Sequence, residues 1–204
     1  MKGNPFLSVW TKPKKTVKEV AEDTSIWFAL LITGIAGISS GLSNLQGKSV
    51  VNDFSTLSLV LLSIPLGMLM GIATAFLTTV SFTLIGKVFG GKSSLKVMFK
   101  GMGAMYIPRM IFSILLLIIV LIAGEQFFIA SETEISANSD FGLEIIIAIL
   151  NAITGIFTII IMSKGVGVLH QFSSWKGFAV VLITGILAFI FTLFVGIGGF
   201  MVFG

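Results

Sequence analysis

Residues 57–84 read LSLVLLSIPLGMLMGIATAFLTTVSFTL, an apolar run without a charged side chain. A helix needs about 20 such residues to cross the roughly 30 Å hydrocarbon layer of a membrane. Four more stretches are long and apolar enough to cross, at Ser25–Asn44, Tyr106–Gly124, Leu143–Ser163 and Phe178–Phe203. Because lipid offers the backbone no hydrogen-bond partners, each stretch must cross as a helix. The sequence therefore predicts an all-α, polytopic membrane protein with five transmembrane helices.

The lysines of the segments outside these helices predict the orientation. The N-terminal arm and the second and fourth connections hold Lys2, Lys12, Lys14, Lys15, Lys18, Lys87, Lys92, Lys96, Lys100, Lys164 and Lys176, whereas the first and third hold only Lys48. Connections rich in lysine tend to stay on the cytoplasmic side. We therefore expect a cytoplasmic N-terminus and, after five crossings, a C-terminus outside. Residues 1–24 form a basic and aromatic cytoplasmic arm in this interpretation, and residues 25–204 form the transmembrane domain.

The composition limits the classes of function. Hydrophobic residues make up 55% of the chain and charged residues 11%, and no connection is long enough to hold a soluble catalytic domain. The net charge of +4 lies beside membrane helices, which favours attraction to anionic lipid headgroups over nucleic-acid binding. The chain has no cysteine, and His170, its only histidine, has no neighbouring acid with which to hold a metal. Without a catalytic grouping of side chains, we expect no enzymatic activity, no metal site and no cofactor.

The arm combines apolar anchors with lysines. Phe6, Leu7 and Trp10 form an aromatic patch, and a helix is expected to begin at Pro13, with Val17, Val20 and Ala21 on one face. Such a segment can lie in the headgroup layer or pack on the protein's own cytoplasmic face, and the two interpretations are compatible. We expect lipid or partner contacts from Asn4, Pro5, Phe6, Trp10, Pro13, Lys14 and Lys15.

Small residues recur at four-residue spacing in the first two crossings. Gly37 and Gly41 share a face of the first, and Gly67 and Gly71 share a face of the second. Such spacing lets two helices approach closely, either within one chain or between two copies in a homo-oligomer. Asn151 is the strongest polar candidate inside the fourth crossing, and an interhelical hydrogen bond is its expected role.

Residues 86–93 read GKVFGGKS, which matches the P-loop pattern of nucleotide-binding proteins letter for letter. A working P-loop follows a β-strand, whereas this segment follows a membrane helix, so we expect no nucleotide. We interpret Gly90, Gly91, Lys92 and Ser93 as a cytoplasmic turn. The next helix should place Leu95, Met98, Phe99 and Met102 on one face and lie in the headgroup layer.

Arg109 is the only arginine, at the predicted cytoplasmic edge of the third crossing. One interpretation is that the Arg109 side chain is an anchor that reaches the headgroups. A more specific interpretation is that it binds a lipid phosphate or a partner's carboxylate. Tyr106, Pro108, Trp175 and Lys176 lie at the same boundary and are predicted to anchor lipid or a partner. No charged side chain is expected near the centre of the membrane, which argues against an ion-coupled transporter.

Four short segments resemble the bacterial and archaeal branch of the Yip1 family: Asn4–Thr16, Gly90–Ser93, Tyr106–Pro108 and Phe172–Lys176. The resemblance implies a non-enzymatic, multi-pass protein of a prokaryotic cytoplasmic membrane. Eukaryotic members bind small GTPases through a long cytoplasmic N-terminal region, and since the arm here is short, GTPase binding is not expected. Some prokaryotic members look like accessory proteins of export or resistance systems.

We therefore interpret the chain as a membrane adaptor or scaffold. The arm and the segments Gly90–Lys100 and Lys164–Lys176 would contact anionic lipid headgroups and a partner protein, such as a transporter or export complex. Two alternatives remain open at this point. The chain could be an accessory subunit of an export or resistance transporter, or a protein that binds or moves lipids.

Overall fold

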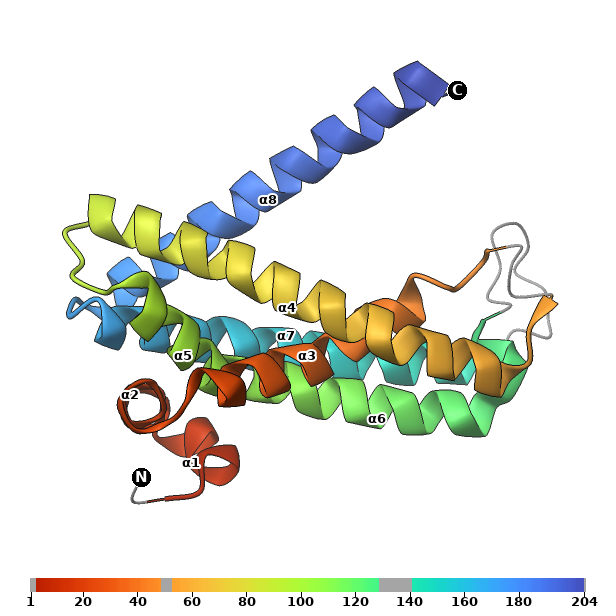
Figure 1. Ribbon diagram of the computed structural model, residues 1–204, viewed down its shortest axis with the longest axis horizontal. Helices are drawn as coiled ribbons and strands as arrows, with labels where there is room; N and C mark the ends of the chain where they lie inside the picture. The colour runs from red at the N-terminus through yellow and green to blue at the C-terminus, as the bar shows by residue number, and fades with distance from the viewer. Residues whose placement is uncertain (1–2, 49–52, 129–140, 204) are drawn as a thin grey trace.

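The computed structural model describes residues 3–48, 53–128 and 141–203, and every regular element in these ranges is a helix. The elements are α1 (Pro5–Thr11), α2 (Pro13–Asp23), α3 (Ile26–Ser43), α4 (Thr56–Val88), α5 (Leu95–Met105), α6 (Ile107–Ala123), the 3₁₀ helix η2 (Gly124–Phe127), α7 (Phe141–Leu169) and α8 (Ser174–Phe203). In Figure 1, α3, α4, α6 and α7 lie along the long axis of the molecule, and α8 diverges from them toward the C-terminus.

Five segments are long and apolar enough to cross a membrane, which confirms the predicted class: Ile26–Ser43, Thr56–Val88, Ile107–Phe127, Gly142–Leu169 and Ser174–Phe194. The α4–α5 turn, the α7–α8 turn and the arm lie at one end of the bundle (Figure 1). The lysine-rich segments are therefore on the same side, as the sequence pattern requires. At this end α4 and α7 extend beyond the apolar runs, to Val88 and Leu169.

Serine and asparagine side chains cap several helices at their N-termini. The Asn4 Oδ1 accepts a hydrogen bond from the backbone N–H of Phe6 at 3.0 Å, and the Ser94 Oγ accepts one from Val97 at 3.3 Å. Ser173 Oγ likewise accepts from the N–H of Lys176 at 3.4 Å. The helix of the arm begins at Pro13, with Lys12 as its N-cap, where the sequence predicts it.

The glycines of α3 and α4 bring the two backbones into direct contact. A Cβ on Gly37 would overlap the carbonyl oxygen of Gly67 and lie 2.5 Å from the Cα of Gly71. A Cβ on Gly41 would lie 2.9 Å from the Cα of Gly67. Both small-residue faces are therefore used inside the chain, which confirms the internal packing that the spacing predicts.

The structure corrects the prediction that the helix after the turn lies in the headgroup layer. Met98 and Met102 of α5 are fully buried and Phe99 nearly so, although Leu95 is exposed. The reason is that α2 lies over α5, which also packs against α3, α4 and α7. The apolar face of α5 is thus covered by protein, and the junction between α5 and α6 lies inside the bundle.

Candidate functional site

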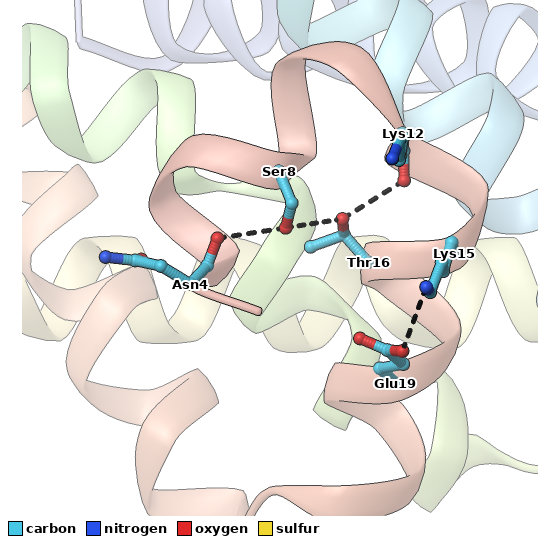
Figure 2. A network of polar contacts seen from close by, with 6 residues as sticks. All are labelled: Asn4, Ser8, Lys12, Lys15, Thr16 and Glu19. Carbon is cyan, nitrogen blue, oxygen red and sulfur yellow. Dashed lines mark hydrogen bonds and ion pairs between the residues drawn. The ribbon is translucent and has the colours of Figure 1, made fainter. Parts of the chain in front are cut away.

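The lysine-rich end of the bundle begins with the arm, whose two short helices are joined by a chain of hydroxyl contacts. Ser8 Oγ donates to the carbonyl oxygen of Asn4 at 2.9 Å (Figure 2). Thr16 Oγ1 lies 2.9 Å from Ser8 Oγ and 3.0 Å from the carbonyl oxygen of Lys12. Because these bonds cross the break at Lys12, they fix the angle between α1 and α2.

The apolar side of the arm packs on the bundle, which answers a question that the sequence left open. Val9, Val17 and Val20 are fully buried and belong to the same core cluster as Met98 and Val166. The Trp10 ring lies edge-on against Phe157 of α7, with a centroid distance of 5.2 Å. The arm is therefore part of the folded protein and packs against the lysine-rich end of the bundle.

Four lysines of the arm, Lys12, Lys14, Lys15 and Lys18, are exposed. Lys15 and Lys18 lie 3.9 Å from Glu19 and Glu22 in the following turn, a weak pairing at an exposed position. Lys100 of α5 donates to the backbone carbonyl of Glu22 at 3.2 Å and so ties α5 to the end of α2. Lysines of α4, the α4–α5 turn, α5 and α8 are also exposed, namely Lys87, Lys92, Lys96 and Lys176.

His170 is the residue that sequence reasoning missed. It follows α7, its side chain is 1% exposed, and its ring stacks on Phe172 with a centroid distance of 5.2 Å. Its Nδ1 accepts from the N–H of Ser93 at 3.3 Å, and its Nε2 lies 3.0 Å from the carbonyl oxygen of Phe82. A neutral imidazole with its proton on Nε2 satisfies both contacts. The ring therefore links the α4–α5 turn to the α7–α8 turn.

The P-loop-like sequence folds around this ring. A Cβ on Gly86 or on Gly91 would overlap the imidazole, and the N–H of Lys92 donates to the carbonyl oxygen of His170 at 3.3 Å. A P-loop offers such backbone N–H groups to phosphate, whereas here Lys92 and Ser93 give theirs to His170. Gly86 and Gly91 of this sequence thus make room for the His170 side chain.

Acid should destabilise this end of the protein. Burial lowers the pKa of His170 below its ordinary value of 6.5, the charge of Lys87 acts in the same direction, and the Phe82 carbonyl opposes them. The unfolded chain then binds the proton more readily, so stability is complete above pH 6.5 and is lost as the pH falls through the lower folded pKa. We expect the thermal midpoint in detergent to fall between about pH 7 and pH 5 in the native chain. The difference from His170→Gln should shrink over the same range; a constant difference would contradict this assignment.

The predicted boundary residues lie in two different environments. Trp175 is 81% exposed and Lys176 is exposed at the start of α8, so both side chains are accessible. Tyr106 and Pro108 are buried instead, because the α5–α6 junction is covered by the bundle.

Arg109 and Asn151 are both corrected by the structure. Arg109 is half-buried beside Gly37 of α3 and Gly71 in the middle of α4, and not at the lysine-rich end of the bundle. The α5 helix occupies the end of the bundle, which places the start of α6 deeper than its sequence neighbours suggest. Asn151 makes no interhelical hydrogen bond within the part of the chain that the structure describes. Its side chain lines a cavity that it shares with Arg109.

Among known proteins, neither the curated sequences nor the solved structures contain a match to this chain. The model of one protein family does match, the Yip1 domain, over residues 7–196. The matched region includes all five candidate spans and most of the arm. The chain therefore belongs to the Yip1 domain family of membrane proteins.

Proposed function

We propose that the protein is a non-enzymatic adaptor of the bacterial and archaeal branch of the Yip1 family, in the cytoplasmic membrane of a prokaryote. One observation carries the proposal: the arm is fixed on the bundle by buried valines, while Lys12, Lys14, Lys15 and Lys18 are exposed. A flexible basic tail would neutralise any anionic surface, whereas a fixed array of lysines can select a partner of complementary shape and charge.

The adaptor surface is defined by the exposed lysines of the arm and of both turns, Lys14, Lys87, Lys92, Lys96 and Lys176, with Trp175 and Leu7 as apolar neighbours. Lysines close to a membrane are attracted to anionic headgroups, so the rim of this surface would rest on lipid. Its centre would hold an acidic segment of a partner protein. A transporter or export complex is the partner class that fits an otherwise non-catalytic membrane protein. An accessory subunit of such a complex would use the same surface.

The test is cross-linking in native membranes. A photo-reactive residue at position 92 or 176 should give a discrete protein product, and one at Lys48, in the connection after α3, should not. Combining Lys14→Glu, Lys92→Glu and Lys96→Glu should lower the yield roughly tenfold, since each lysine contributes at most about 1 kcal/mol and salt screens part of it. Lys48→Glu is the matched control.

Two outcomes would contradict the adaptor function. One is that neither position gives a protein product. The other is that the triple variant accumulates normally and its cross-linking yield is unchanged. The same chain reports the orientation, because it contains no cysteine. A single cysteine at position 96 should react with a membrane-impermeant maleimide only after the cells are lysed. Labelling in intact cells would place this surface outside and remove it from cytoplasmic partners.

A further inference from the structure

Two cavities meet at Arg109 inside the bundle. The first has a volume of about 320 Å³ and is lined by residues of α3, α4, α6 and α7, among them Gly37, Ser40, Thr74, Tyr106, Arg109 and Thr158. The second, of about 230 Å³, is lined by α3, α6 and α7, among them Ser40, Ser43, Asn44, Arg109, Phe112 and Asn151. Ser40 and Arg109 belong to both. The two cavities therefore adjoin at these two residues and form one region, whose lining is part polar and part apolar.

The charge of this region is positive and uncompensated. Arg109 is the only charged side chain lining either cavity, and it forms no ion pair within the described ranges. The other polar side chains there are hydroxyls and amides, which can donate hydrogen bonds to an anion. A cation enclosed by membrane helices is costly unless an opposite charge or water compensates it. The composition of the lining thus favours an anionic ligand.

The position of Arg109 is fixed by the helix that carries it. Ser113, one turn later in α6, donates to the carbonyl oxygen of Ala36 at 2.7 Å and accepts from the N–H of Ser39 at 3.3 Å. These two bonds join α6 to α3 beside the cavities. An arginine whose purpose was to reach the headgroups would not need a helix held at this depth, and it would not face the middle of α4.

The polar lining also provides a path to the surface. From Arg109 it continues through Ser40 to Ser43 and Asn44, which are exposed at the end of α3. Asn151, on the facing side of α7, is exposed as well. A ligand can therefore reach the guanidinium from the end of the bundle opposite to the adaptor surface, between α3 and α7.

We propose that this region binds a phosphate group, with the Arg109 guanidinium as its counter-charge and the hydroxyls of Ser40 and Thr74 as hydrogen-bond donors. A planar guanidinium can hold two phosphate oxygens at once, which a lysine cannot. The phosphate belongs either to the headgroup of a phospholipid that enters between α3 and α7, or to free inorganic phosphate. Both sources present the same chemistry to Arg109.

Two measurements on the purified full chain separate these sources. Native mass spectrometry with added phosphatidylglycerol reports bound lipid, and equilibrium dialysis with radiolabelled inorganic phosphate reports the free anion. Arg109→Gln should weaken binding at least about tenfold in one of the two, because it removes the charged partner of a buried pair. Arg109→Lys should restore part of the affinity. Lys48→Gln, which removes an exposed cation outside both cavities and outside the adaptor surface, should change neither.

A second variant covers the case in which Arg109→Gln does not fold. Ser40→Leu keeps the guanidinium and fills the space where the two cavities meet, so it should also weaken binding of the same probe. Loss in the lipid measurement identifies a headgroup site, and loss in the dialysis identifies a free-phosphate site. Unchanged binding of both probes in both variants, or equal loss in Lys48→Gln, would overturn the proposal.

Discussion

Gly37→Ala should destabilise the protein by about 3 kcal/mol or more, and Gly37→Leu should prevent the folded chain from accumulating. The neighbours of a new Cβ at this position are the backbone atoms of Gly67 and Gly71, with the Cα of Gly71 at 2.5 Å. A side chain in the way could change its rotamer, but a helix backbone cannot. The substitution therefore requires α3 and α4 to separate, and all the contacts along this interface weaken together.

Gly155→Ala is the matched control. Gly155 lies in α7, and a Cβ there would meet no atom within 4 Å. Both substitutions gain the same helix propensity, up to about 1 kcal/mol, so their difference isolates the packing at Gly37. Thermal unfolding followed by circular dichroism in a mild detergent measures this difference. Equal midpoints for the two alanine variants would show that α3 and α4 are not in backbone contact.

The crossings could be predicted from sequence because each depends on a local property, an apolar run of sufficient length. A close helix–helix contact was also predictable, because Gly37 and Gly67 belong to small residues at four-residue spacing, which let membrane helices approach closely. Which helices meet is a separate matter. The same glycines could have served a second copy of the chain, and only the fold assigns them to each other.

Arg109 shows where this local reasoning ends. Its neighbours in sequence are the lysines of the turn and of α5, which indicate the membrane surface. In the fold, α5 lies under α2 and carries the start of α6 into the bundle, so sequence distance from Lys100 does not measure depth. The apolar face of α5 was misassigned for the same reason. An amphipathic helix covered by lipid and one covered by another helix have the same pattern.

His170 could not have been found by composition, because its partners are far away in sequence. Ser93 and Phe82 lie 77 and 88 residues from it. A signal was present in Gly86 and Gly91, since a P-loop pattern outside an α/β context leaves its glycines without a purpose. The sequence pattern does not identify His170 as the side chain for which these glycines leave space.

The contact between Gly86 and His170 predicts that substituting either residue alone strongly destabilises the protein. It also predicts that the two substitutions together partly suppress each other's effect. A Cβ on Gly86 overlaps the imidazole, and all three of its nearest neighbours are atoms of that ring. Gly86→Ala alone should therefore cost about 2–3 kcal/mol, because the ring must leave the position in which Ser93 and Phe82 hold it. His170→Ala alone should cost a similar amount, about 2–3 kcal/mol, for the cavity and the two unpaired backbone groups.

Combined, the two substitutions should cost less than their sum by about 1–3 kcal/mol, since the new methyl group on α4 then occupies space that the ring has left. Gly91 supplies the contrast. A Cβ at Gly91 meets the imidazole too, but it also lies 2.7 Å from the carbonyl oxygen of Gly86, which the loss of the ring does not move. His170→Ala should therefore rescue Gly91→Ala much less than Gly86→Ala. Unfolding in detergent gives all the free energies of both cycles. Additive effects at Gly86 would mean that the turn is not built around His170, because two groups that compete for one space cannot be removed independently.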